Sequence, residues 1–423
     1  MKRLILFLVA MNLLSVQTNA QYQRCGTDAH QAALEQNDPS VKVKRQQAEQ
    51  QINKIVADNP QYKTGMIVTI PVVFHILYTN AAQNISDNYI FEQLDVLNDD
   101  FSRMNLDAVN TRSQFQPVGA NTQIQFCLAK RTPTGAATNG IVRVSYTGSF
   151  PSNPHTVSPE WDHTRYMNIY VGDIGGGLLG YANFPPGSVG NDHVVILYSA
   201  VGGPNLSGSA NPYHLGRTAT HEIGHYFNLY HTFQSGCAGT TANNCTSGGD
   251  QICDTPPVGS PTFGCPTNNP NTCTETSPFP PPYTSNMVDM YENYMDYSDD
   301  ACMNIFTLGQ STRMNAAITG PRSLLITSLG CTPVGMNELL DENAVTVMPN
   351  PSPGIYEVAL NLSSKTKVEM TLTDVSGKVI FSDVIDYPVT TKHTIDITNK
   401  SNGIYQLRIQ TANGYLMRRL VKL

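Results

Sequence analysis

The chain has 423 residues, which is enough for two or three domains. Its net charge of -7 argues against nucleic acid as a partner, because phosphates require a basic face. Hydrophobic residues make up 40% of the chain and allow a packed core, while charged residues make up only 14%. With 32 Gly and 27 Pro, this composition favours a loop-rich extracellular protein over a helical cytosolic one.

The first 20 residues have the layout of a secretory signal peptide. Two basic residues precede an apolar run from Leu4 to Leu14, and Thr18-Asn19-Ala20 offers a small-residue cleavage site. The alternative is a membrane helix, but the run is too short to cross a bilayer about 30 Å thick. No later segment is long and apolar enough to do so. We therefore expect an exported chain without a transmembrane segment, from which residues 1–20 are removed.

Residues 21–63 are polar and Gln-rich, and Val41 to Val56 has a helical pattern with little apolar face. A segment of this kind, directly after a signal peptide, is typical of a pro-segment. A disordered tail is the alternative that composition leaves open.

A series of apolar segments then indicates an α/β half-domain built on an open sheet. A β-branched run at Ile67–Tyr78 predicts a buried strand. Ser86 can cap a helix in which Ile90, Leu94, Leu97 and Phe101 have helical spacing. Further strands are predicted at Gln123–Ala129, Met167–Val171 and His193–Tyr198. Residues 234–288 are rich in Cys, Gly and Pro, and a loop of this length needs disulfides or ions to be ordered.

The segment from His221 to His231 has the pattern of a catalytic metal site. His221 and His225 are four residues apart, so a helix places both imidazoles on one face. Glu222 can hold and deprotonate a water on the metal. His231 reaches the same ion only if the chain turns near Asn228, a residue type that tolerates the left-handed conformation. Three His ligands and one open position are typical of a catalytic zinc site.

The motif continues into Thr232-Phe233 and is followed by a second characteristic segment at residues 293–302. Together they resemble the metzincin clan of metalloproteases and, within it, the pappalysin family, over about residues 67–331. Asn228 replaces the Gly that is commoner in the clan. The resemblance implies an α/β catalytic domain, bounded here at residues 64–331, with a twisted mixed sheet, an active-site helix and an irregular C-terminal subdomain. It also implies a catalytic zinc.

The resemblance also implies roles for single residues. Met295 would lie in the turn beneath the metal, and Tyr297 would donate a hydrogen bond to the oxyanion. Asp300 would line the base of the S1′ pocket and select Arg, or less well Lys, just after the scissile bond. The alternatives are a core Met, a surface Tyr and a loop carboxylate.

Two further regions resemble family features. The edge strand above the cleft corresponds to Leu178–Ala182, where Leu179, Gly180 and Tyr181 would pair with substrate. The segment with Asp250, Asp254 and Thr255 resembles a calcium-binding loop, and we expect Asp250 and Thr255 to be ligands of a structural calcium ion. An ordinary edge strand and a plain Asx-turn are the alternatives.

Nine cysteines in an exported chain predict disulfides with one thiol left over. The family pattern implies the pairs Cys245–Cys273 and Cys265–Cys302, which leaves Cys237–Cys253 and Cys127–Cys331. Cys25 would be unpaired.

The segment Arg24-Cys25-Gly26-Thr27 resembles the cysteine switch of the family, in which a thiolate replaces the catalytic water as the fourth zinc ligand. An enzyme that prefers Arg or Lys could remove this pro-segment by cutting before Arg45, Lys54 or Lys63. A free or intermolecularly paired cysteine is the alternative.

Residues 332–343 have the composition of a linker, and residues 344–423 predict a small β-sandwich. Alternating strands at Lys367–Asp374, Lys378–Ile385, His393–Ile397 and Gly403–Thr411 are separated by turn signals. Residues 350–356, 374–379, 402–405 and the C-terminus resemble the type IX secretion sorting domain. This implies the type IX machinery as a partner and a Gram-negative bacterium that exports the protein through the periplasm to the medium or cell surface. A carbohydrate- or protein-binding sandwich is the alternative.

Taken together, these patterns predict a latent zinc endopeptidase that acts on proteins or peptides. A surface adhesin with a structural zinc site is the alternative from another class, and the presence of Glu222 and Tyr297 argues against it. A zinc hydrolase with a non-peptide substrate is a third hypothesis, against which the edge strand argues.

Overall fold

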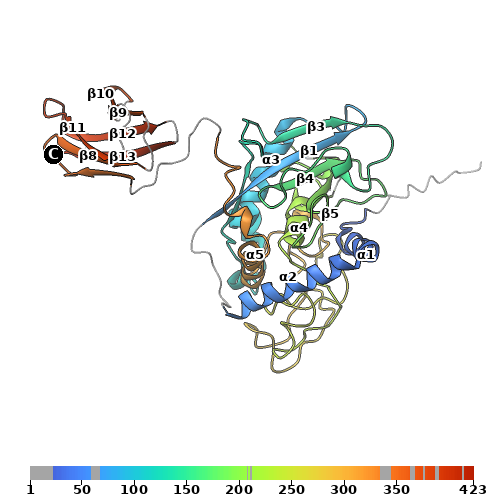
Figure 1. Ribbon diagram of the computed structural model, residues 1–423. Helices are drawn as coiled ribbons and strands as arrows, with labels where there is room; N and C mark the ends of the chain where they lie inside the picture. Colours follow the sequence, from blue (N-terminus) through green and yellow to red (C-terminus); the bar gives the residue numbers. More distant parts are fainter. Residues whose placement is uncertain are drawn as a thin grey trace, which may run out of the picture. The chain divides into compact units, whose positions relative to one another are not determined.

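The computed structural model describes residues 22–58, 67–206, 208–209, 212–333, 344–362, 367–374, 377–385, 390–411 and 414–423. The expected signal peptide, most of the expected linker and Lys63 lie outside these ranges. The chain divides after Cys331 into two compact units, which we describe separately (Figure 1). Within the described ranges, no helix has the length and apolarity needed to cross a membrane.

A six-stranded mixed sheet forms the centre of the first unit (Figure 1). Its order is β2-β1-β4-β6-β5, and β3 pairs with the C-terminal half of β1. All pairs are parallel except that of β5 with β6, so β5 is an antiparallel edge strand. The strands are β1 (Val68–Tyr78), β2 (Ile124–Leu128), β3 (Ile141–Ser145), β4 (Met167–Gly172), β5 (Gly180–Ala182) and β6 (His193–Leu197). The mixed α/β fold and the strands expected at β1, β2, β4 and β6 are confirmed, whereas β3 was not predicted.

The two faces of the sheet belong to separate cores because side chains alternate along each strand. Ile70, Val72 and Phe74 of β1 pack with the apolar side chains of two helices, α3 (Asp87–Ser102) and α4 (Arg217–Tyr226). Leu77 packs on the opposite face. The helix predicted after Ser86 is therefore present as α3, although the Ser86 side chain makes no capping hydrogen bond.

A third helix of this unit, α5 (Leu308–Thr319), begins with a capping box in which Thr307 and Gln310 bond each other's backbone. Short 3-10 helices connect the larger elements at Leu106–Asn110, Gln116–Val118, Pro154–Thr156, Tyr198–Ala200, Asp300–Cys302 and Ser323–Leu325.

The expected pro-segment forms two helices that belong to the same unit, α1 (Thr27–Asn37) and α2 (Pro39–Asp58). Helix α2 runs beside α5 (Figure 1), and Ile52 of α2 is fully buried against Ala316 and Ala317. The alternative of a disordered tail is therefore wrong. The apolar face of α2 is as small as the sequence indicates, and small residues on α5 let Ile52 bury completely.

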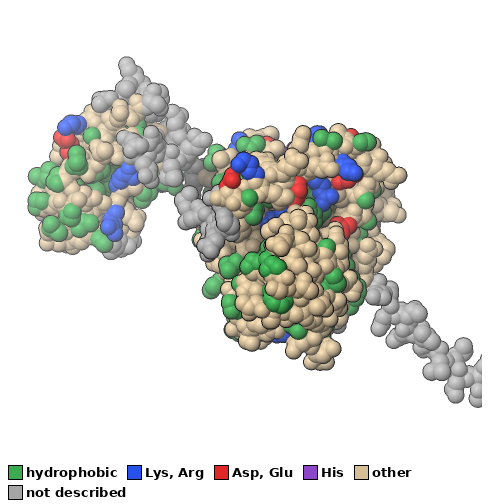
Figure 2. All heavy atoms as spheres, turned by 90° about the horizontal axis from the view of Figure 1, so that it is seen from below, with side chains coloured by type: hydrophobic (Ala, Val, Ile, Leu, Met, Phe, Trp, Pro, Cys, Tyr) green, Lys and Arg blue, Asp and Glu red, His purple; other side chains and the backbone are tan. Residues whose placement is uncertain are grey.

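Residues 234–288 form a lobe made of turns and held by disulfides. In the face seen in Figure 2, most atoms belong to the backbone or to side chains that are neither charged nor hydrophobic. This agrees with the low share of charged residues in the chain, 14%.

The disulfides Cys127–Cys331 and Cys265–Cys302 agree with the expected pairs. The expected pairs Cys245–Cys273 and Cys237–Cys253 are wrong, because the structure pairs Cys237 with Cys273 and Cys245 with Cys253. The physical reason is a tight reversal after Cys245. Backbone hydrogen bonds from Gly248 to Asn244 and from Gln251 to Gly248 bring Cys253 back beside Cys245, with 4.9 Å between their Cα atoms.

The second unit is an all-β sandwich of two antiparallel sheets, with strand orders β10-β9-β12-β13 and β11-β8-β7. Its own core contains Tyr356, Leu360, Leu372 and Leu407. The strands are β7 (Val345–Met348), β8 (Ile355–Asn361), β9 (Val368–Asp374), β10 (Val379–Ile385), β11 (Thr390–Asp396), β12 (Gly403–Thr411) and β13 (Gly414–Lys422). The predicted β-sandwich is confirmed.

Candidate metal centre

Helix α4 places His221 and His225 one turn apart on the face that points toward residue 231. The helix ends at Tyr226, and Asn228 takes the left-handed conformation with a φ of 72°. The N–H of Asn228 donates to His225 O (2.8 Å), and the N–H of Leu229 donates to Gly224 O (2.9 Å). This turn returns the chain so that His231 Nε2 lies 3.1 Å from His225 Nε2, as the turn residue at 228 predicts.

The three imidazoles present lone pairs to one another. His221 Nδ1 lies 2.6 Å from Tyr294 O, and His225 Nδ1 lies 2.7 Å from Leu229 O. A carbonyl oxygen can only accept, so both Nδ1 atoms carry the proton and both Nε2 atoms are unprotonated. These two Nε2 atoms are nevertheless 3.2 Å apart and fully buried. Facing acceptors at this distance need a cation between them, and the donor set suits zinc.

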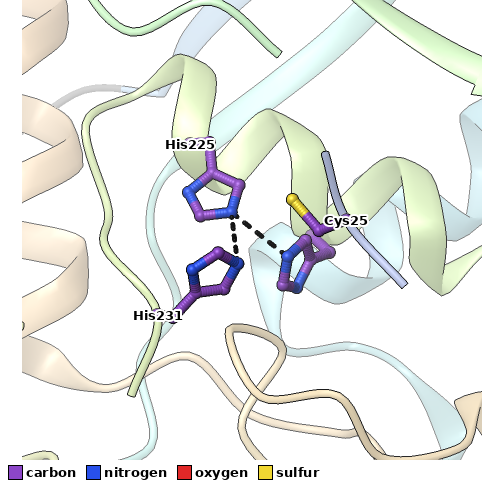
Figure 3. Close-up of side chains that lie close together, drawn as sticks. Cys25, His225 and His231 are labelled. Carbon is purple, nitrogen blue, oxygen red and sulfur yellow. Dashed lines mark hydrogen bonds between the residues drawn. The ribbon is translucent and has the colours of Figure 1, made fainter. Parts of the chain in front are cut away.

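Cys25 completes the group from the pro-segment. Its Sγ and the ring nitrogens of the three histidines all lie within 4.8 Å of one another and are buried. In Figure 3 the side chains of Cys25, His225 and His231 point toward a common centre. Burial and the nearby Glu222 carboxylate raise the pKa of the Cys25 thiol, so a thiolate at this position requires a metal ion.

The surroundings of the histidines include two residues from opposite sides of the centre. Met295 is fully buried under α4, and a Cβ at Gly224 would collide with its sulfur, so the predicted Met lies against the active-site helix. Asp28 of α1 lies 3.2 Å from His231 Nδ1. A carboxylate on the second nitrogen orients a ligating imidazole. Sequence reasoning missed Asp28, since α1 was not predicted.

Glu222 lies beside the metal-binding group and is fully buried. Its Oε2 accepts hydrogen bonds from Thr27 Oγ1 (2.8 Å) and Cys25 Sγ (3.5 Å). Burial raises the pKa of Glu222 to about 8, against the lowering effect of these two donors. Gly180 of β5 leaves the room that this side chain occupies, because a Cβ there would lie 2.9 Å from Glu222 Cγ.

Tyr297 packs edge-on against aromatic rings beside the histidines. Its ring centroid lies 5.1 Å from that of His231 and 4.8 Å from that of Phe233. Burial, Cys25 and Glu222 raise the pKa of the phenol, so the hydroxyl keeps its proton and can donate.

Asp300 is buried and forms an ion pair with an arginine side chain from the expected pro-segment. Arg24 Nη1 lies 2.8 Å from Asp300 Oδ1, and neither side chain is exposed. The other carboxylate oxygen accepts from the backbone N–H of Leu215 (2.9 Å). Tyr213 covers the guanidinium with its ring centroid 4.6 Å away, and Met303 Sδ lies 3.2 Å from Nη2. Tyr213 and Met303 were not predicted, because no motif marks them.

The pro-segment pairs with the predicted edge strand. The N–H of Leu179 donates to Gln23 O (3.0 Å), and the N–H of Gly26 donates to Gly180 O (2.9 Å). Tyr181 lies in the same short strand, β5, and its ring packs on His30 at 4.4 Å. The edge strand therefore accepts an added chain in this structure.

The expected calcium segment lies away from the histidine group. Asp250 is buried, and its carboxylate accepts from Thr255 Oγ1 (2.5 Å) and from the N–H of Ile252 (3.1 Å). Burial raises the pKa of Asp250 to about 8 despite these hydrogen bonds. Asp254 instead accepts from Thr307 Oγ1 (2.7 Å) and Gly309 N (2.8 Å), so it holds the start of α5.

Two family models match the chain. A peptidase model described as pregnancy-associated plasma protein-A matches residues 151–319, and a secretion system C-terminal sorting domain matches residues 346–423. An extracellular metalloprotease of Verticillium alfalfae is 35% identical over 255 residues, which are 59% of this chain and 77% of that protein. Extracellular metalloprotease 1 of Coccidioides posadasii is 32% identical over 261 residues, 59% of this chain and 76% of the relative.

Solved structures agree with these relatives. A mutant of Tannerella forsythia promirolysin is 37% identical with a TM-score of 0.60, and covers 74% of this chain and 100% of its own. Mature mirolysin from the same organism, in complex with a cleaved peptide, is 42% identical with a TM-score of 0.52, and covers 61% of this chain and 95% of its own.

The fold and the site thus define a metalloendopeptidase, and the C-terminal sorting domain marks it as secreted by the type IX route. The chain belongs to the pappalysin family.

Proposed function

We propose that the protein is a zinc-dependent endopeptidase, made as a latent zymogen, that cuts peptide bonds preferentially before Arg and less well before Lys. The observation that carries the specificity is the buried contact of Arg24 with Asp300. A pocket that ends in a carboxylate and is capped by the Tyr213 ring matches a guanidinium better than an ammonium.

The residues around the metal have distinct tasks in this reaction. His221, His225 and His231 would hold zinc, which when bound supplies a Lewis acid and an acidified water. Glu222 Oε2 takes the proton of the attacking water and returns it to the leaving amine. The Tyr297 hydroxyl donates a hydrogen bond to the oxyanion that forms on the substrate carbonyl. Strand β5 aligns the substrate by backbone pairing through Leu179 and Gly180.

Latency follows from the same contacts. Cys25 occupies the position of the catalytic water, Thr27 bonds the Glu222 carboxylate, and Arg24 fills the Asp300 pocket. Removal of the pro-segment would free all three at once. Two of the expected cleavage sites, before Arg45 and Lys54, lie inside helix α2, which must unwind to be cut. Lys63 lies outside the described residues, and cleavage before it remains the third proposed activation site.

Two finer roles belong to the same proposal. Asp250 and Thr255 bind a structural calcium ion; a buried carboxylate in a lobe without helices or strands supports this role. The sorting domain is recognised by the type IX machinery and delivers the enzyme from the periplasm to the medium or the cell surface.

Cleavage of a peptide library by the activated enzyme tests the proposal. We expect cuts before Arg, fewer before Lys, and none after chelation or with Glu222→Ala. Asp300→Ala should spread the cuts to other residues while total activity on casein persists. Cuts without preference for Arg by the unchanged enzyme would refute the specificity, and absence of any zinc-dependent cleavage would refute the function.

A further inference from the structure

Helix α2 contributes one carboxylate to the catalytic part of the unit, at the turn between His225 and His231. Glu49 Oε2 accepts hydrogen bonds from Asn228 Nδ2 (2.9 Å) and from the Tyr230 hydroxyl (3.0 Å). Its second oxygen accepts from Arg313 Nη2 of α5. The charge of Arg313 and these hydrogen bonds lower the pKa of Glu49 although the side chain is largely buried. All three donors belong to the catalytic part and none to the pro-segment.

The three donors are held in place without Glu49. Arg313 Nε donates to Asn228 O (2.8 Å), and the guanidinium lies over the Tyr230 ring at 5.0 Å. The left-handed turn and the bond from its N–H to His225 O fix the backbone of Asn228. An arginine oriented by its own hydrogen bond to a carbonyl oxygen and by a ring contact is a preorganised hydrogen-bond donor to a carboxylate.

An apolar surface of α5 that contacts a helix lies next to these donors. Ile52, three residues after Glu49, is buried against Ala316 and Ala317 of α5, and Ile55 and Val56 pack at its border. Asn53, four residues after Glu49, bonds Arg313 Nη1 (3.0 Å). Residues three and four apart share one face of a helix, so one face of α2 presents both the carboxylate and the aliphatic side chains.

We propose that Arg313, Asn228 and Tyr230 form a carboxylate-binding site for an apolar-faced helix, and that α2 itself occupies it after the pro-segment is cut from the catalytic part. The released pro-segment then binds the enzyme in trans, through residues other than the metal ligands and Asp300. The inference rests on one part of the proposed function, which is that the pro-segment is cut from the catalytic part. The ligand class is an acidic side chain followed, one turn later, by an aliphatic one.

The test uses the full chain, with residues 60–63 replaced by the recognition sequence of a site-specific protease, so that cutting needs no activity of the enzyme itself. After cutting, the catalytic part is freed of the fragment at high salt, where ion pairs are weakened. Binding of a fluorescent peptide of residues 39–58 is then followed by anisotropy. This peptide lacks Cys25 and Arg24, so it cannot reach the metal or the pocket.

We expect saturable binding that Glu49→Gln weakens by about 10- to 100-fold, because a charge-assisted contact is lost. Asp58→Asn is the matched control in the same peptide, since among the described residues Asp58 pairs with exposed Lys54 of the same helix. It should leave the affinity within about two-fold. Absence of binding by the unchanged peptide, equal binding by the Gln variant, or equal weakening by both variants would each overturn the site. Casein hydrolysis by the same preparation reports on the proposed function independently.

Discussion

Tyr297 stands beside the histidines without being a ligand, and its place depends on ring packing. Its centroid lies within 5.1 Å of the His231 centroid, and Phe233 and Phe263 surround the remaining faces. The ring is thus fixed independently of its hydroxyl, so a change of the hydroxyl alone leaves the packing intact.

Tyr297→Phe should therefore lower kcat while leaving KM nearly unchanged, since the lost hydrogen bond forms only in the transition state. Removal of one oxyanion donor costs about 10²- to 10³-fold in kcat. Steady-state kinetics on an Arg-containing peptide provide the measurement. Tyr166→Phe removes a hydroxyl on the other face of the sheet, bonded to Arg131 O, and serves as the control. Equal effects of the two variants would argue against a role for Tyr297 in catalysis.

The histidines could be predicted from sequence because their positions are set locally, by helix spacing and one turn. The partners of the site could not. Arg24 meets Asp300 across 276 residues, and Asp28 reaches His231 only because α1 folds over the site. The family resemblance pointed to Cys25 and Asp300 separately. That Arg24 and Cys25 occupy the pocket and the metal centre together emerged from tertiary packing alone.

Among the elements, the loop lobe of residues 234–288 has the least regular structure and carries a buried carboxylate at Asp250. The folded-state pKa of Asp250, about 8, lies above its ordinary value of 3.8, so the folded state binds its proton more tightly than the unfolded state. This favourable contribution is full below about pH 4 and is lost as the pH rises toward about 8. A bound cation at the ionised carboxylate would offset the loss.

Asp250→Asn separates these effects because the amide keeps the shape and loses the charge. In chelator at pH 8 we expect the variant to be at least as stable as the parent, since no buried charge has to form. In calcium the parent should gain several degrees in Tm and the variant should not. Thermal unfolding at pH 5 and pH 8, with and without calcium, is the measurement. An equal gain for both proteins would place calcium elsewhere.

The strands and helices differ in how well their sequences mark them. β1 and β4 are predominantly apolar, and α3 has clear helical spacing, so all three were predicted. β3 is half-buried throughout and shows no alternation, and α1 is polar enough that only Thr27 and Gln31 are buried. Such elements are stabilised mainly by packing against neighbouring elements, and a single sequence gives little indication of these contacts.

At the scale of the whole molecule, the two units have separate hydrophobic cores. The change in sequence pattern after Cys331 marked this division, and the fold class of each unit could be predicted from its own pattern. Disulfide pairing could not, because the correct partners of Cys237 and Cys245 depend on one tight reversal within the lobe.

Removal of residues 344–423 should therefore leave peptide hydrolysis unchanged and shift the unfolding transition of the catalytic unit by less than about 2 °C, because no core residue is lost from it. Calorimetry of the full chain and of the shortened chain provides the comparison. In the native host the shortened protein should accumulate in the periplasm. Loss of the catalytic transition on truncation would contradict the independence of the units.

Five consecutive residues of the expected pro-segment, Gln23–Thr27, contact strand β5, Asp300, the histidine group and Glu222. A linear peptide of that length, with arginine directly before a thiol, therefore contains all the groups that make these four contacts. The peptide backbone sets the spacing of these groups. The sequence is therefore a starting point for the design of small thiol-containing inhibitors of secreted proteases of this kind.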